Sequence, residues 1–458
     1  MTMPLWTLDD AARALQGRVL GDGGVRPSGL SLDGRTLVPG EAFVALRADR
    51  DGHDFAAQAV QKGAAALLVD HQLDLPVPQL VVRDTLEALQ SWGRLRLEQV
   101  RPAAVFGVTG SVGKTSTKEL LAAAVQGWRT PGNRNNTLGL PEALAGLPDG
   151  ETAAVLEMGM SYPGEIETLV RIAPLDFGLI TCVGTAHVEN FPTGQEGIAR
   201  AKGELVAGLR PGGTWVHLGS DPWCRWIAEQ PWAAEFRAVR VGEREPFGWS
   251  EVRSLGPRGE RFLLRTPEGE VDVTLRLQGA HQVRNAALAG SLATLAGFPL
   301  EAVADRMGAV EPEPGRGRLH ALRAGGWLLD ESYNASADSI LACAASLLDL
   351  PGGEPIAVLG CMRELGGEAA RLHREVGAGL RALGLARIWV YGDHAADLAA
   401  GFGEDARAFP DFEGLRDAGD GLSALPAGAR ILVKGSRHWR AERAVEWLLE
   451  HRSEESNP

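Results

Sequence analysis

The alternation of apolar and polar residues predicts a chain built from short buried strands and helices. Within the first hundred residues, the segments 42–47, 65–70 and 78–84 have the length and apolar content of strands, and 85–97 has the spacing of a helix. A basic residue and a proline at 101–102 then interrupt the pattern. These features predict a small N-terminal α/β unit that ends there.

From residue 103 the pattern becomes strand, glycine-rich turn and helix, which is how a doubly wound parallel sheet begins. The apolar runs 153–159 and 177–184 fit further buried parallel strands of the same sheet. Alternating residues on both sides of 266–270 predict an antiparallel hairpin. Proline and glycine cluster at 311–320, where we expect a second boundary.

Beyond this cluster, four apolar runs alternate with helical segments rich in alanine and leucine, at 327–332, 356–360, 386–392 and 429–435. This pattern predicts one more α/β domain. The expected fold class is therefore α/β with three domains. They are a small N-terminal α/β domain (1–100), a central P-loop domain with a doubly wound parallel sheet (101–313) and a C-terminal Rossmann-like α/β domain (314–458).

Composition narrows the class of protein. The chain has 46 basic and 59 acidic residues, a net charge of -13, which argues against nucleic acid or an anionic membrane as the main partner. No apolar run approaches the length of a membrane span, and an acidic pair stands where a signal peptide needs basic charge. The 4 cysteines are widely spaced, which favours reduced thiols. We expect a soluble, cytoplasmic protein.

Lysine is scarce in this chain. Of the 46 basic residues, five are lysines (Lys62, Lys114, Lys118, Lys202 and Lys434), which leaves 46 minus 5, or 41, arginines. A genome-wide bias toward arginine codons is the ordinary cause. Against that background, a retained lysine favours a position that needs a compact or deprotonatable amine.

A strong motif lies between a predicted strand and a predicted helix, where residues 109–115 read Thr-Gly-Ser-Val-Gly-Lys-Thr. Small residues allow backbone N–H groups to surround phosphate oxygens, a lysine reaches the outer phosphates, and a threonine hydroxyl can bind Mg²⁺. The usual P-loop has glycine at the position of Val108, so a plain glycine turn is the alternative. We expect an ATP site formed by Gly110, Ser111, Val112, Gly113, Lys114, Thr115 and Ser116.

Three more residues could serve the nucleotide or its metal ions. Glu157 and His187 follow strand ends, and the carboxyl ends of parallel strands face the ligand crevice. A buried glutamate is unfavourable unless it is paired or metal-bound, whereas a structural role remains an alternative for the histidine. Pattern alone describes Lys202 as a solvated helix residue. The scarcity of lysine favours instead a desolvated amine that adds CO₂ to become a carbamate ligand.

The motifs together resemble the Mur ligases of peptidoglycan synthesis, whose own P-loop lacks the first glycine. The matching segments, in chain order, are TGSVGKT, LEMG, GTAHVENF, AKGE, GAHQVRNAALA, GRGRL, DESYNASADS, LGCMRELG and LVKGSRHW. Residues 31–55 are similar to the family's UDP-sugar-binding segment. The match is best with the branch that joins D-alanyl-D-alanine to UDP-N-acetylmuramoyl-tripeptide.

This resemblance implies an ATP-dependent amide ligase that works through an acyl phosphate. It assigns catalytic roles to Lys114, His187 and Lys202. It also implies two Mg²⁺ ions, one held by Thr115 and Glu157 and the other by His187 and carbamylated Lys202. The expected partners are UDP-N-acetylmuramoyl-tripeptide and D-alanyl-D-alanine, with no nucleic acid and no membrane span, and the protein is expected to be a monomer.

Other residues match the family's ligand contacts. His281 and Asn285 would contact adenine, although an N-cap and a polar helix face explain them equally well. Arg316 and Asp330 would contact phosphate and ribose, against the alternative of solvated strand ends. The expected substrate-binding residues are Asp33, Arg35, Asn334, Asp338, Lys434, Ser436 and Arg437.

Two other functions stay open at this point. One is a related ligase, either the Mur enzyme that adds the third amino acid or a folylpolyglutamate synthase-like enzyme. The other is a nucleotide switch that uses the P-loop without ligation. The sequence does not identify the third residue of the acceptor peptide.

Overall fold

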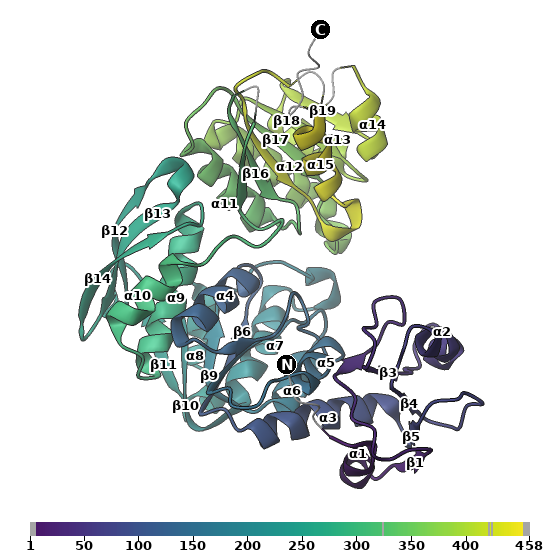
Figure 1. Ribbon diagram of the computed structural model, residues 1–458. Coiled ribbons are helices and arrows are strands. Elements are labelled where there is room, and N and C mark those ends of the chain that lie inside the picture. The colour runs from purple at the N-terminus through teal and green to yellow at the C-terminus, as the bar shows by residue number, and fades with distance from the viewer. Residues whose placement is uncertain (1–5, 323–324, 420–421, 423–424, 452–458) are drawn as a thin grey trace.

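The computed structural model describes residues 6–322, 325–419, 422 and 425–451. Three parallel or mostly parallel sheets follow one another along the chain, each covered by helices, and form three α/β domains (Figure 1). The expected fold class is therefore confirmed. No helix among these residues is both long and apolar enough to cross a membrane.

The N-terminal sheet has the strand order β1-β5-β4-β3-β2, and only the β1–β5 pair is antiparallel. Its strands are β1 (Arg18–Leu20), β2 (Leu30–Ser31), β3 (Ala42–Val44), β4 (Ala66–Val69) and β5 (Gln79–Val81). Its helices are α1 (Leu8–Leu15), α2 (Ala56–Gln61) and α3 (Thr85–Val100). The three strands and the helix expected here are present, and the short strands β1 and β2 were missed.

The central sheet is parallel throughout, in the order β11-β10-β9-β6-β8-β7. Its strands are β6 (Ala104–Thr109), β7 (Trp128–Arg129), β8 (Ala153–Glu157), β9 (Leu175–Ile180), β10 (Leu209–Leu218) and β11 (Arg237–Val241). The helices around it are α4 (Lys114–Val125), α5 (Gly139–Ala145), α6 (Glu165–Ile172), α7 (Gln195–Ala207), α8 (Pro222–Ala228), α9 (Ala280–Leu295) and α10 (Leu300–Gly308).

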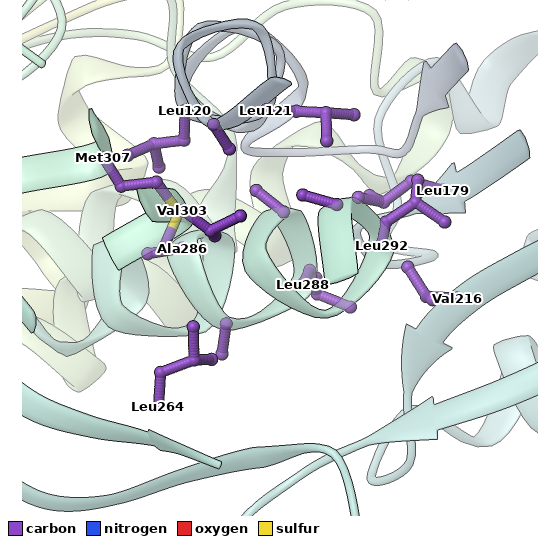
Figure 2. Packing of buried hydrophobic residues seen from close by; sticks show 14 of the residues in the cluster. Leu120, Leu121, Leu179, Val216, Leu264, Ala286, Leu288, Leu292, Val303 and Met307 are labelled. Carbon is purple, nitrogen blue, oxygen red and sulfur yellow. The ribbon is translucent and has the colours of Figure 1, made fainter. Parts of the chain in front are cut away.

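An antiparallel sheet of three strands follows the central sheet, made of β12 (Gly248–Ser254), β13 (Glu260–Thr266) and β14 (Gly269–Leu275). The expected hairpin is the β13–β14 pair. Figure 2 shows how α9 fills the space between this sheet, α4 and the central sheet. Leu288 and Leu292 lie on α9, with Leu120 and Leu121 of α4 on one side and Leu264 of β13 on another. The P-loop helix is thus fixed by a large apolar core.

The C-terminal sheet has the order β15-β16-β20-β17-β18-β19, with only β15–β16 antiparallel. Its strands are β15 (Arg318–Ala321), β16 (Trp327–Glu331), β17 (Pro355–Gly360), β18 (Arg387–Tyr391), β19 (Ala406–Phe409) and β20 (Arg430–Lys434). Its helices are α11 (Ala337–Leu348), α12 (Ala369–Leu383), α13 (Ala395–Phe402), α14 (Phe412–Asp417) and α15 (Glu442–His451).

Candidate active site

The glycine-rich turn joins β6 to α4, as the motif predicts. Gly110 and Gly113 have φ angles of 151° and 84°. A Cβ on Gly110 would lie 1.8 Å from Oγ1 of Thr181, and one on Gly113 would lie 2.7 Å from Oδ1 of Asn285. Both glycines are therefore required, because the turn packs closely against the end of β9 and the first turns of α9.

Side chains of the motif stabilise the turn from within. Nζ of Lys114 donates to the carbonyl oxygen of Gly110 at 2.7 Å, and burial lowers the pKa of this amine. Oγ of Ser111 accepts the N–H of Gly184 at 2.8 Å. Val112 and Ser116 are half-buried beside them. All seven expected nucleotide-binding residues of the motif thus belong to one turn and one helix start.

Thr115 and Glu157 meet at the carboxyl edge of the central sheet. Oγ1 of Thr115 donates to Oε2 of Glu157 at 2.8 Å, and Glu157 is only 1% exposed. Nδ2 of Asn135 donates to the other carboxylate oxygen, Oε1, at 2.8 Å. A hydroxyl beside a buried carboxylate offers the hard oxygen ligands that Mg²⁺ prefers. Sequence reasoning missed Asn135, although an asparagine-rich loop after β7 contains it.

Lys202 lies on α7 and is 3% exposed, so its interpretation as a solvated helix residue is wrong. Burial and the nearby charge of Lys114 lower the pKa of Lys202 to about 7. The thiols of Cys182 and Cys224 oppose this shift. A large fraction of the amine is therefore neutral near pH 7, which is the form that reacts with CO₂.

His187 follows β9 and lies in the loop before α7. Its Nδ1 atom faces Oε2 of Glu364, a residue of the C-terminal part of the chain. The close contact with His187 lowers the pKa of the Glu364 carboxyl group. Glu364 was missed, and its signal was its place within the matched LGCMRELG segment, although its partner depends on how two domains pack.

His281 and Asn285 lie on the first turns of α9, and no side chain caps this helix. The N-cap alternative is therefore wrong. Nδ2 of Asn285 donates to Oε1 of Gln282 at 3.1 Å, next to the P-loop turn. Nδ1 of His281 lies 3.4 Å from Oγ of Ser346 on α11, and burial lowers the pKa of the histidine to about 4. Asn285 thus faces the P-loop, and His281 faces the C-terminal domain.

Asp330 lies near the end of β16 and closes the turn that carries Arg316. Its Oδ1 accepts from the hydroxyl of Ser332 at 2.6 Å, and its Oδ2 accepts the N–H of Gly315 at 3.2 Å. Asp330 is buried, so it is not a solvated strand end. The guanidinium group of Arg316 stacks on the ring of Tyr333, 3.9 Å from its centroid. Tyr333 was missed, and its signal was its place within the matched DESYN segment.

The expected residues Lys434, Ser436 and Arg437 lie at and just after the end of β20. Lys434 is buried and its Nζ lies 3.4 Å from Oε2 of Glu331. Ser436 is buried, while Arg437 is exposed and pairs with Glu442 at 3.1 Å.

Asp338 and Asn334 lie at and before the start of α11. Asp338 approaches the loop of His187, since a Cβ on Gly184 would lie 2.8 Å from its Oδ2. Asn334 is exposed, and its Oδ1 accepts the N–H of Ala335.

The two expected residues of the N-terminal domain pair with each other. Asp33 and Arg35 form an ion pair of 2.8 Å, and Arg35 holds the pKa of Asp33 at about 2. Nζ of Lys62 donates to the carbonyl oxygen of Arg35. This domain thus carries its own cluster of charged groups.

Family models match the chain over most of its length. The Mur ligase family catalytic domain matches residues 27–111, the Mur ligase middle domain 108–293, and the glutamate ligase domain of Mur ligases 317–437. The chain is 36% identical to UDP-N-acetylmuramoyl-tripeptide–D-alanyl-D-alanine ligase of Escherichia coli, covering 97% of this chain and 98% of that protein. The enzyme of the same name from Bacillus subtilis is 32% identical over 92% of this chain and 93% of its own.

Solved structures give the same result. A crystal structure of MurF from Acinetobacter baumannii matches with a TM-score of 0.88 and 31% identity, covering 98% of this chain and 100% of that one. MurF from Thermotoga maritima in complex with ADP matches with a TM-score of 0.80 and 27% identity, over 93% of this chain and 98% of that one. The chain therefore belongs to the Mur ligase family.

Proposed function

We propose that this chain is an ATP-dependent ligase that joins D-alanyl-D-alanine to the tripeptide of UDP-N-acetylmuramoyl-tripeptide. The observation that carries the proposal is the buried pair of Thr115 and Glu157 at the P-loop, with Lys114 and Lys202 close by. Relatives named for this activity match the chain nearly from end to end. Together these observations support a nucleotide-dependent ligation.

The residues at the P-loop fit Mg²⁺. The hydroxyl of Thr115 and the carboxylate of Glu157 would hold one ion, and His187 with carbamylated Lys202 would hold a second. When bound, Mg²⁺ supplies positive charge that offsets the negative charge of the phosphoryl group during its transfer. The carbamate forms when the neutral amine of Lys202 bonds to the carbon of CO₂ and loses a proton. The low pKa and the burial of this amine support that reaction.

The protein's part in the chemistry is to position charges and reactants. Lys114 and the N–H groups of the turn would hold the β- and γ-phosphates of ATP. The γ-phosphoryl group passes to the terminal carboxylate of the tripeptide, which gives an acyl phosphate and ADP. The amino group of D-alanyl-D-alanine then attacks the activated carbonyl carbon, and phosphate leaves. An acyl phosphate is a far better acyl donor than a free carboxylate, which is why ATP is consumed.

We assign the remaining contacts by domain. Residues 1–100 would bind the UDP-sugar through Asp33 and Arg35, and residues 101–313 would bind ATP, with Asn285 and His281 near adenine. Residues 314–458 would close on the nucleotide through Arg316 and Asp330, on phosphate and ribose. The incoming dipeptide would contact the C-terminal residues Asn334, Asp338, Lys434, Ser436 and Arg437.

Closure of the C-terminal domain would protect the acyl phosphate from water. Gly315 and Gly317 supply a hinge, since their φ angles are 73° and 89°, which glycine adopts without strain. The four cysteines are free thiols. The reduced thiols and nucleotide substrates support a cytoplasmic enzyme.

A coupled phosphate-release assay tests the function. Release that requires ATP, D-alanyl-D-alanine and UDP-N-acetylmuramoyl-tripeptide together supports the proposal. Release with a single amino acid or with glutamate would instead assign a related ligase. Absence of ADP formation with all reactants present would contradict ligation altogether.

A further inference from the structure

Lys118 is a buried lysine on α4 that the proposed chemistry does not use. Its side chain is 0% exposed and lies one helical turn beyond Lys114. It is among the 5 lysines that remain in a chain where arginine is otherwise the basic residue. Burial of an ammonium group is unfavourable unless its charge and its protons are compensated. Its contacts therefore indicate its role.

The Lys118 ammonium donates two hydrogen bonds and forms an ion pair. Nζ lies 2.9 Å from the carbonyl oxygen of Thr130 and 3.0 Å from that of Gly132. A carboxylate oxygen of Glu119 lies 3.0 Å from the same nitrogen. Two of the three ammonium donors are therefore hydrogen-bonded, and the Glu119 carboxylate compensates the charge. Lys118 thus ties the P-loop helix, which the core of Figure 2 holds in place, to the segment that follows β7.

The segment after β7 holds Glu157 at two points. Oγ1 of Thr130 accepts the backbone N–H of Glu157 at 3.1 Å, and Nδ2 of Asn135 donates to its Oε1 at 2.8 Å. Nζ of Lys118 also lies 3.8 Å from Oε2, the oxygen that accepts from Thr115. Lys118 therefore acts on Glu157 through this segment and directly through its charge.

We propose that Lys118 is a positioning residue for binding of the metal–nucleotide complex, because it fixes the orientation of the Glu157 carboxylate beside Thr115. The inference rests on the proposed function only in taking these two residues as the groups that hold Mg²⁺. Removal of a group that orients a metal ligand typically lowers metal affinity or activity by about 10–100-fold. Arginine cannot replace this lysine, because a planar guanidinium group does not direct three donors from one atom.

The test measures binding of Mn²⁺, a stand-in for Mg²⁺, to the full chain with ADP by electron paramagnetic resonance and without peptide substrates. Lys118→Met keeps the apolar stem and removes the ammonium group. Arg129→Met is the matched control, because Arg129 pairs with the same Glu119 from the exposed side. We expect the first variant to weaken Mn²⁺ binding by about tenfold or more and the control to change it by less than about twofold.

A second readout separates positioning from general structural damage. In the ligase assay, Lys118→Met should raise the Mg²⁺ concentration for half-maximal rate more than it lowers kcat at saturating Mg²⁺. A purely structural role would lower kcat and leave the half-saturating concentration unchanged. If Lys118→Met does not fold, Asn135→Ala carries the test, because Asn135 lies at the other end of the same chain of contacts.

The outcomes are distinguishable from failure of the proposed function. Wild-type protein that binds Mn²⁺ with ADP, together with a folded variant of unchanged affinity, would overturn the inference alone. Wild-type protein that binds no Mn²⁺ with ADP would overturn both the inference and the proposed metal site. In a double variant, Lys118→Met with Asn135→Ala, the loss in Mn²⁺-binding free energy should be smaller than the sum of the losses in the two single variants, because both residues act through Glu157.

Discussion

Nδ1 of His187 faces the carboxylate of Glu364, and this contact joins the central and C-terminal domains. The backbone of both residues adopts the left-handed conformation, with φ angles of 63° and 62°, which non-glycine residues rarely adopt. The loops approach closely, since a Cβ on Gly366 would lie 3.1 Å from Cβ of Glu189. Two loops with unusual backbone conformations therefore meet at the histidine that we propose as a metal ligand. A carboxylate on one ring nitrogen leaves the other nitrogen free and fixes the ring.

Substitution of Glu364 should therefore impair catalysis without removing a contact with the nucleotide. We expect Glu364→Ala to lower kcat by about 10–100-fold and to raise the Mg²⁺ concentration needed for half-maximal rate. Initial rates measured against Mg²⁺ concentration check this. Glu368→Ala is the control, because Glu368 is exposed and pairs with Arg371 instead of His187. Equal rates for the two variants would show that the contact with His187 has no role in the reaction.

The pairing of Thr115 with Glu157 could be predicted from the sequence. Both residues follow apolar runs that form adjacent parallel strands, and the carboxyl ends of such strands meet at one edge. The burial of Lys202 could be expected from lysine scarcity, although its helix pattern alone indicated the opposite. Composition and strand order were therefore sufficient to predict the central residues of the site.

Asn135, Tyr333 and Glu364 could not be predicted in the same way. They lie in loops, where a polar residue ordinarily faces water, and their partners come from distant parts of the chain. The strands β1 and β12 were missed for a related reason, since β1 has no buried residue, most residues of β12 are exposed, and both lack a regular apolar pattern. Packing between elements determines the role of such loop residues and the formation of such strands, and a local sequence pattern does not show that packing.

The P-loop turn should not tolerate a side chain at Gly113. Its φ angle of 84° is strained for alanine, and the new Cβ would lie 2.7 Å from Oδ1 of Asn285. We expect Gly113→Ala to weaken ADP binding by about tenfold or more, an effect of about 1.4 kcal/mol, measured by isothermal titration calorimetry. Gly212→Ala is the control, because Gly212 has a similar φ of 78° with nothing within 4 Å. That variant should keep its affinity for ADP, and an equal loss in both would refute the steric argument.

Lys202 should be essential for turnover. Lys202→Ala removes the amine that carries the proposed carbamate, so we expect kcat to fall by about a hundredfold or more. Added bicarbonate should not restore activity, because no amine remains to accept CO₂. Arg200→Ala serves as the control, since Arg200 is exposed on the same helix and pairs with Glu196. Full activity of Lys202→Ala in the phosphate-release assay would rule out the carbamate role while leaving the fold assignment intact.

His281 should make the folded protein sensitive to acid. Burial lowers its pKa to about 4, with Glu331 opposing and Lys434 and Arg284 reinforcing the shift. An unfolded chain titrates a histidine near pH 6.5, so between about pH 6.5 and 4 the unfolded state binds the proton more readily. The contribution of neutral His281 to the free energy of unfolding is therefore fully present above about pH 6.5 and is lost as the pH falls toward 4.

The expected size follows from the same shift. Because His281 is partly exposed, the loss should be on the order of 2 kcal/mol, less than the full separation of the two pKa values implies. His281→Gln removes the titrating group, so the gap in melting temperature between wild type and variant should shift in favour of the variant as the pH falls from 6.5 to 4. Groups that titrate in both proteins cancel in this difference. A gap that stays constant across the window would mean that His281 does not become harder to protonate on folding.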